Sequence, residues 1–343
     1  MRIGMRDGTD QSTTNTTNKK TIIVMNKQLP DYRSKEDSVL YIIGNGFDLY
    51  HGLNTNYSDF YDWLSKEGHR DFVDKMQTIY PDVDPNANVA SKDGGYMLWR
   101  DFEEALRHNT DLLELHKLFG GDGLDSLPIE KQITKASDNV SNVLSQIRPL
   151  LLEWAESFTE EYGKIKKLLP LGKNSKYITF NYTKVLEEVY QITDKKHVWH
   201  IHGSVDDGKA ITGYDKRLIN DTIYGTAIEE ASERNILKEL QKMRKPTEDV
   251  YTNCPEAFKS LQGIDTIIVI GHSLSDVDIA YFRYMLYSIP DYVDIKWQYW
   301  IHSEEAIVKT QERVIELCND HSSLEVKMNA KMWNPFVMDN PRH

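Results

Sequence analysis

The chain has no long apolar segment and very few cysteines. Over 343 residues the longest apolar runs, such as Val39–Ile43, are about five residues long, whereas a membrane-spanning helix needs about twenty. We therefore expect a soluble protein with no membrane partner. Cys254 and Cys318 stand far apart and outside any Cys-x-x-Cys pair. This argues against a zinc knuckle or a disulfide framework and favours the reducing cytoplasm.

Basic side chains are also in deficit. Lys and Arg number 41 against 53 Asp and Glu, a net charge of −12. Residues 1–36 form a polar stretch, predicted to be a disordered tail, with seven basic and four acidic side chains. The rest of the chain, with 34 basic and 49 acidic, therefore carries −15. Such a surface repels phosphate backbones, so we expect no extended nucleic-acid binding. The negative charge still allows a local nucleotide pocket.

Short runs rich in β-branched and aromatic residues predict strands. The first and fourth runs are apolar without alternation, as in strands buried on both faces of a parallel sheet. Between the later runs lie segments whose apolar residues have helical spacing. This alternation indicates an α/β fold with a Rossmann-like, mostly parallel sheet formed by residues 37–55 and 176–335. The predicted strands are Val39–Ile43, Lys176–Phe180, His197–Ile201, Asp265–Ile270, Lys296–Ile301 and Leu324–Met328.

Residues 56–175 have helical spacing throughout and predict a large helical insertion after the first strand. Its main pieces are His69–Tyr80, Met97–Phe119 and Ile129–Leu169, and Pro149 should kink or divide the last. A further helix over Ala227–Lys245 is expected to cover one face of the sheet.

Polar residues follow four of the predicted strands. Gly44–Asp48 comes after the first, Asn181–Thr183 after the second, His202–Ser204 after the third and Gly271–Ser273 after the fourth. Ligands of open parallel sheets bind outside the carboxyl ends of the strands, so one edge is the expected site.

Gly44 and Gly46 allow a tight turn and the approach of a diphosphate to backbone amides. They form only half of the Gly-x-Gly-x-x-Gly fingerprint of dinucleotide-binding domains, because Leu49 stands in place of the third glycine. A simple turn without a bound nucleotide is an equal alternative. In the last loop, Ser275 or Asp276 is the expected helix cap, which leaves Ser273 and Asp278 to hold a ribose or phosphates.

His200 and His202 lie two apart on a strand and could bind a metal with His51, Asp48 or His272. We favour a core role for His200 and an exposed His202, and we expect no metal. Within Trp99–Glu104, an amphipathic helix with Phe102 inward is favoured over a direct role for Asp101 and Glu103.

These motifs, in this order, resemble the bacteriophage abortive-infection AbiH family over residues 38–302. They are more distantly similar to sirtuin-like NAD-binding domains. The spacing of the glycine loop in those domains is kept here by Gly44, Gly46, Gly52 and Leu53. Sirtuin-like zinc cysteines and the Pro-Asp-Phe-Arg step are absent, and Thr183 replaces an aspartate. The absence of the zinc module weakens deacylation more than NAD cleavage.

The resemblance implies a phage-defence effector that binds and hydrolyses NAD⁺ or a related nucleotide. Asn181 would hold the ribose or a water, His202 would act as general base, and Asp48 would favour the developing cation. Alternatives are a non-catalytic nucleotide sensor whose insertion contacts a partner, such as a phage component or a second copy, and a metal-dependent nuclease or phosphohydrolase. The expected nucleotide-binding residues are Gly44, Asn45, Gly46, Phe47, Gly52, Thr179, Gly203, Gly271, His272, Ser273, Asp276 and Asp278.

Overall fold

The computed structural model describes most of the chain between the predicted tail and the C-terminal region. The predicted tail falls outside the described residues up to residue 34, and the predicted strand Leu324–Met328 falls outside them entirely. The described residues are 35–81, 101–106, 109–121, 126–214, 227–247, 255–289, 296–300, 312–313 and 333–336.

A six-stranded sheet in the order β3-β2-β1-β4-β5-β6 forms the centre of the fold, and every strand pair is parallel. This confirms the predicted α/β, Rossmann-like sheet, whose strand order reverses between β1 and β4. The strand β6 was not predicted, and it lies after the predicted strand Leu324–Met328, which the described residues do not include. The strands are β1 Val39–Ile43, β2 Lys176–Thr179, β3 Val198–His200, β4 Thr266–Ile270, β5 Lys296–Trp300 and β6 Trp333–Phe336.

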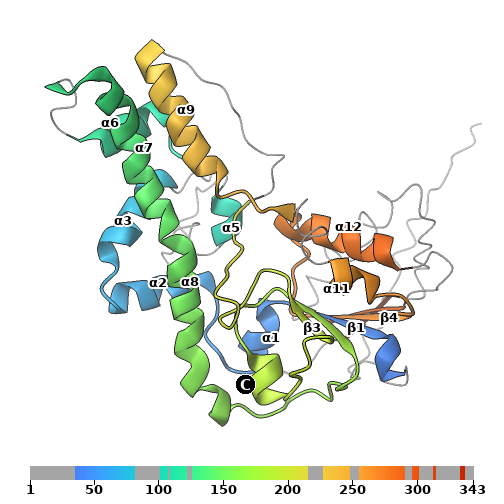
Figure 1. Ribbon diagram of the computed structural model, residues 1–343. Coiled ribbons are helices and arrows are strands. Elements are labelled where there is room, and N and C mark those ends of the chain that lie inside the picture. Colours follow the sequence, from blue (N-terminus) through green and yellow to red (C-terminus); the bar gives the residue numbers. More distant parts are fainter. Residues whose placement is uncertain are drawn as a thin grey trace, which may run out of the picture.

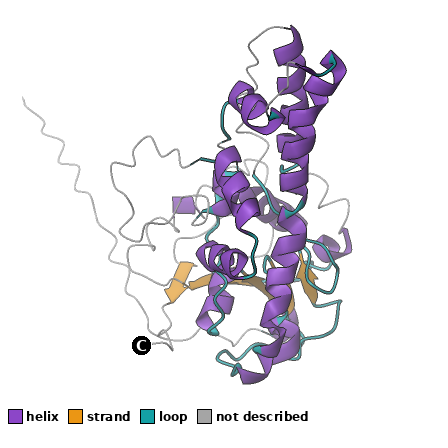
Figure 2. Ribbon diagram, turned by 90° about the vertical axis from the view of Figure 1, so that its left-hand side faces the viewer, coloured by secondary structure: helices purple, strands orange, loops and turns teal. Residues whose placement is uncertain are grey.

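The central strands are buried on both faces, which explains their unbroken apolar sequences. Alternate residues of β1 enter two separate cores: Leu40 and Ile42 join one, and Tyr41 and Ile43 the other. Helices α11 (Pro255–Lys259) and α12 (Ile279–Ser288) close the first core (Figures 1 and 2). Helix α1 (Asn45–Tyr50) and the π-helix η5 (Val185–Val189) close the second. The result is a three-layer arrangement.

The chain between α1 and β2 contains six α-helices among the described residues. Their apolar sides pack into one shared core, which includes Phe60 and Trp154. Reciprocal bonds between Asn56 and Asp59 start α2, and the Asp111 carboxylate caps α6. The helices are α2 Tyr57–Lys66, α3 Arg70–Ile79, α5 Phe102–Ala105, α6 Leu112–Gly120, α7 Ile129–Ser145 and α8 Ile147–Glu156.

The long predicted helix over Ile129–Leu169 is divided, as Pro149 indicated. The break falls at Gln146, which places Pro149 in the first turn of α8, where its missing N–H costs nothing. Helix α8 ends at Glu156, earlier than expected, and is followed by two 3₁₀ turns, η3 (Ser157–Glu160) and η4 (Tyr162–Lys164).

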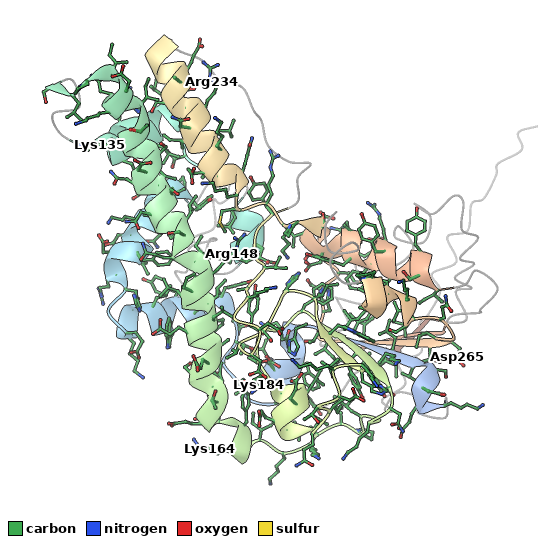
Figure 3. The ribbon with its side chains drawn as sticks, viewed as in Figure 1. Lys135, Arg148, Lys164, Lys184, Arg234 and Asp265 are labelled. Atoms are coloured by element: carbon green, nitrogen blue, oxygen red, sulfur yellow. The ribbon has the colours of Figure 1, made fainter. Side chains whose placement is uncertain are left out.

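Helix α9 (Ala227–Gln241) packs on the inserted helices, so the expectation that it covers the sheet was wrong. Ile236, Leu237 and Leu240 join the core of the insertion, and α9 runs beside α7 (Figure 1). Arg148 lies on α8 (Figure 3), and its guanidinium donates to the Lys242 carbonyl at 3.2 Å. Among the described residues, no helix has the length and apolarity required to cross a bilayer.

Candidate functional site

The turns after β1 and β4 touch at the point where the strand order reverses. The Gly46 amide donates to the Gly271 carbonyl at 2.9 Å. A Cβ atom on Gly44 would lie 2.6 Å from that same carbonyl, and one on Gly271 would lie 2.3 Å from the Phe47 amide. The glycines therefore allow two backbone turns to meet. The Gly46 amide, predicted to receive a diphosphate, is occupied by this contact.

Asp48 and Asn181 meet beside these turns, one from α1 and one from the loop after β2. The Asn181 amide group donates to the Gly44 carbonyl at 3.1 Å, and the Asn181 backbone N–H donates to Thr179 Oγ1 at 3.2 Å. The Thr183 hydroxyl donates to Asp48 Oδ2 at 2.5 Å. Two neighbouring strand ends thus bring a carboxylate, an amide and a hydroxyl to one point.

A cavity of about 90 Å³ opens at Asp48 and Asn181. Helix α1 and the loop after β2 form one part of its wall, and the inserted segment from Thr55 to Phe158 forms the rest. Asp48 Oδ1 and Thr55 Oγ1 are buried at this site without a hydrogen-bond partner. Such orphaned acceptors and donors favour a bound polar group. The cavity is lined by Asn45, Asp48, Thr55, Tyr57, Trp154, Ala155, Phe158, Phe180, Asn181, Tyr182 and Thr183.

Asp48 is buried, with 1% of its surface exposed. Burial raises its pKa to about 7, although the Thr183 hydroxyl that bonds Asp48 and the nearby Asn181 amide act in the opposite direction. Both groups are neutral, so they do not supply the positive charge that would keep the carboxylate ionised. Asp48 can therefore exchange a proton near neutral pH, as a general acid or base must.

A second buried cluster forms around Asp278, which precedes α12. Lys245 Nζ donates to Asp278 Oδ1 at 2.6 Å and to Glu103 Oε2 at 2.8 Å. His202 Nε2 lies 3.2 Å from Asp278 Oδ1, and His272 Nε2 lies 3.5 Å from Asp278 Oδ2. The Leu274 amide donates to His272 Nδ1, which leaves His272 Nε2–H as the donor to Asp278.

Charge compensation governs this cluster. Burial would raise the pKa of Asp278, but the Lys245 ammonium and His202 hold it well below its usual value. Burial and the nearby Lys245 lower the pKa of His202, which favours the neutral imidazole. Phe102 of α5 is buried in the core of the insertion, as predicted. Glu103, from the same helix, reaches the edge of the sheet through its bond to Lys245. The cluster joins the insertion to the edge of the sheet.

The cavity and the cluster are neighbours, but His202 does not line the cavity. The edge of its ring contacts Phe180, with ring centroids 4.9 Å apart, and Phe180 lines the cavity. His202 is 3% exposed, so the expected exposed histidine is buried. Its predicted role as the general base remains a prediction.

Of the other candidate metal-binding histidines, His272 shares Asp278 with His202, whereas His200 and His51 lie apart from them. Strand β3 ends at His200, after which the chain turns, so His200 binds Glu187 Oε1 at 2.9 Å, whereas His202 faces Asp278. His51 Nε2 lies 2.6 Å from the Tyr190 hydroxyl. Within the described ranges, no group of three or more His, Cys, Asp or Glu side chains is arranged to hold a metal ion.

The remaining predicted site residues are spread over the edge. Ser273, Asp276 and Gly52 are exposed, and Asp276 forms an ion pair with Arg313 at 2.7 Å. Ser275 has no side-chain capping bond, although its backbone carbonyl accepts from the Asp278 amide. Phe47 is part of the core below the sheet. The Gly203 amide donates to the His200 carbonyl at 2.9 Å and closes the turn after β3.

Sequence reasoning missed Lys245 and the importance of Thr183. Lys245 follows a helix and precedes Pro246 like an ordinary surface lysine, and nothing in its local sequence indicates burial. Thr183 was noted only as a replacement for aspartate. Its position two residues after Asn181 was the available signal.

The comparisons with known proteins agree with the motifs. No curated protein and no solved structure gives a significant match to the chain. The family model described as "Bacteriophage abortive infection AbiH" matches residues 40–300, about three quarters of the chain. This range contains β1 to β5, the inserted helices, the Asp48 cavity and the Asp278 cluster. The chain therefore belongs to the AbiH family of bacteriophage abortive infection.

Proposed function

We propose that this protein is an abortive-infection effector that binds and hydrolyses NAD⁺ or a related nucleotide at the Asp48 cavity. One observation carries the proposal: a buried carboxyl with a pKa of about 7 and an unpartnered oxygen lies beside Asn181 at the carboxyl ends of β1 and β2. Family membership supports the defence role. The sirtuin-like resemblance of the motifs supports NAD as the substrate.

The chemistry requires little from the protein. Water attacks the anomeric carbon of the ribose, the bond to the nicotinamide nitrogen breaks, and its electron pair leaves with the neutral ring. Ionised Asp48 takes the proton of the water and favours the cationic ribose. Asn181 orients the water or the ribose hydroxyls. His202 acts on this site indirectly, because it supports Phe180 from the Asp278 cluster.

Substrate entry requires the insertion to move. The cavity, at about 90 Å³, is smaller than the ~300 Å³ of ordinary ligand pockets. Trp154 and Ala155 of α8, with Phe158 of η3, form the wall opposite the strand ends. We infer that this wall is the lid and that infection opens it.

The test is hydrolysis of NAD⁺ by the purified protein, with and without phage lysate, followed as release of nicotinamide and ADP-ribose. Asp48→Asn and Asn181→Ala should each lower turnover by about 10²-fold or more, the usual effect of losing a proton-transfer group. Asp62→Asn, which replaces an exposed carboxylate on α2 outside the cavity, is the control and should keep full activity.

Other outcomes lead to the alternatives. Tight nucleotide binding without turnover would identify a sensor. Activity that a chelator abolishes would identify a metal-dependent hydrolase. No binding and no turnover, even with lysate from infected cells, would contradict the proposal.

A further inference from the structure

A larger cavity lies beside the edge strand β3. Its volume is about 390 Å³, within the ~300–1,000 Å³ typical of small-molecule sites and large enough for a nucleoside. Its walls come from β3, from η5, from the turn after β3 and from α11. It shares no lining residue with the Asp48 cavity. We call it the β3 cavity.

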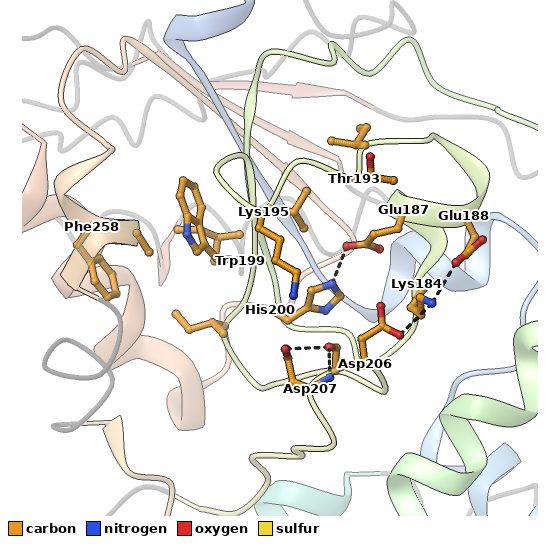
Figure 4. Close-up of a pocket in the computed structure, with 16 residues that line it drawn as sticks. Lys184, Glu187, Glu188, Thr193, Lys195, Trp199, His200, Asp206, Asp207 and Phe258 are labelled. Carbon is orange, nitrogen blue, oxygen red and sulfur yellow. Dashed lines mark hydrogen bonds and ion pairs between the residues drawn. The ribbon is translucent and has the colours of Figure 1, made fainter.

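The two sides of the β3 cavity differ in chemistry. Trp199 and Phe258 stand on one side, and Glu187 and His200 stand on the other (Figure 4). Ile178 adds apolar surface. Aromatic and apolar walls favour a flat ring that stacks on them.

Glu187 supplies an uncommitted hydrogen-bond acceptor. Its Oε1 lies 2.9 Å from His200 Nε2, whereas its Oε2 is buried without a hydrogen-bond partner. His200 Nδ1 is directed at the Asn181 carbonyl at 2.9 Å, so both ring nitrogens of His200 face acceptors. An imidazolium at this position donates to both acceptors. A ligand donor would satisfy Oε2.

The charge of the walls excludes phosphate as the main recognition element. Two lysines and four carboxylates line the cavity, and Lys184 is already paired with Glu188 and Asp206 at 3.0 Å each. Ser204 and Asp207 bond each other at 2.8 Å. The net charge is negative, so an uncharged ligand with N–H donors fits better than an anion.

We propose that the β3 cavity binds a nucleobase or nucleoside that carries an exocyclic amine, with the ring against Trp199 and the amine on Glu187. This site is separate from the Asp48 cavity. His200 connects the two, because one of its nitrogens contacts Glu187 and the other contacts the backbone of Asn181. The site is thus placed to report a small base-containing ligand to the cavity.

Calorimetric titration of the full chain with adenosine, guanosine and cytidine tests the proposal. At least one should bind with a Kd below 1 mM. Its partner without the exocyclic amine (purine riboside, inosine or uridine, respectively) should bind at least tenfold more weakly, because a hydrogen bond to a charged group contributes about 1.5–3 kcal/mol. This comparison uses the wild-type protein and does not depend on any variant folding.

Variants then locate the site. Glu187→Gln should weaken binding at least tenfold. Glu130→Gln, at an exposed position of α7 outside the β3 cavity, should leave Kd within about twofold. Asp48→Asn should also bind normally, which separates this proposal from the hydrolase proposal. The β3 proposal is overturned if no nucleoside binds, if amine and amine-free partners bind equally, or if Glu130→Gln weakens binding as much as Glu187→Gln.

Discussion

Asp48 and Asp278 are buried carboxylates that follow strands of the same sheet, yet their acidities move in opposite directions. The pKa of Asp48 rises to about 7, and that of Asp278 falls well below its usual value. Burial acts alike on both. Asp278 has the Lys245 ammonium at 2.6 Å, whereas Asp48 is bonded by the neutral Thr183 hydroxyl. The neighbouring charge therefore decides which carboxylate is a permanent anion and which exchanges protons.

The same difference separates their roles. The Asp278 cluster holds together the ends of β3 and β4, the segment after α9 and helix α5 of the insertion, so its function is to assemble the edge. Asp48 has a free oxygen and lines a cavity, so its position suits chemistry. The Asp278 cluster is strongly bonded, whereas the Asp48 carboxyl lacks a hydrogen-bond partner at one oxygen. This arrangement is expected where one region stabilises the fold and its neighbour is kept reactive.

Removing the cation should have the largest effect. Lys245→Met leaves Glu103 and Asp278 buried without compensation, so the free energy of unfolding should fall by about 3–5 kcal/mol. Urea unfolding at pH 7 measures this. Lys184→Met, which breaks an ion pair with the more exposed Asp206 and Glu188, should cost no more than about 1 kcal/mol. Equal losses for the two lysines would contradict the distinction.

Replacing Asp48, the carboxylate without a compensating charge, should raise the free energy of unfolding instead of lowering it. The folded pKa of Asp48, about 7, exceeds the ordinary carboxyl value of 3.8, so folding takes up a proton between these values. Wild-type stability should therefore fall as pH rises from about 4 to 7 and then level off. Asp48→Asn lacks this loss and should be more stable than wild type at pH 8 by up to about 4 kcal/mol.

That advantage should shrink as the pH is lowered towards 4. Urea unfolding of both proteins at pH 5 and pH 8 measures the change. An Asp48→Asn variant that is less stable than wild type at pH 8 would show that the carboxylate is compensated after all. Activity should be lost in the same variant, because amide nitrogen cannot take the proton.

Changing the hydrogen bond to Asp48 should have the smallest effect. Thr183→Val removes the donor that favours the ionised form, so the pKa of Asp48 should rise further, by about one unit if the bond contributes about 1.5 kcal/mol. The pH at which turnover reaches half its maximum should move upward by the same amount. Thr159→Val, at an exposed site in η3, is the control. An unchanged midpoint would mean that a group other than Asp48 controls the pH dependence.

Sequence reasoning succeeded where one strand or turn carries the information. The apolar runs of β1 and β4 predicted a parallel sheet, and Pro149 predicted a break in the long helix. The residues after β1 and β2 predicted that Asp48 and Asn181 lie at one edge, and they line the same cavity.

It failed where a residue's partners come from distant segments. Lys245 is buried only because Glu103 and Asp278, far away in sequence, both reach it. Helix α9 has charged residues like those of a surface helix, and its packing on α7 follows from the shape of the insertion. His200 and His202 separate because β3 ends between them. The strand ends one residue earlier than predicted, and a shift of that size is beyond what spacing can determine.

The direct test of Asp48 is an NMR titration of the protein labelled with ¹³C in the carboxyl groups of its aspartates. Asp48→Asn identifies the signal by removing it. An Asp48 that lacks a compensating charge will titrate with a midpoint near pH 7, while the Asp278 signal stays that of an ionised carboxylate down to the lowest pH at which the protein is folded. An Asp48 midpoint near 3.8 would contradict the assignment of this carboxyl as the proton-exchanging group of the site.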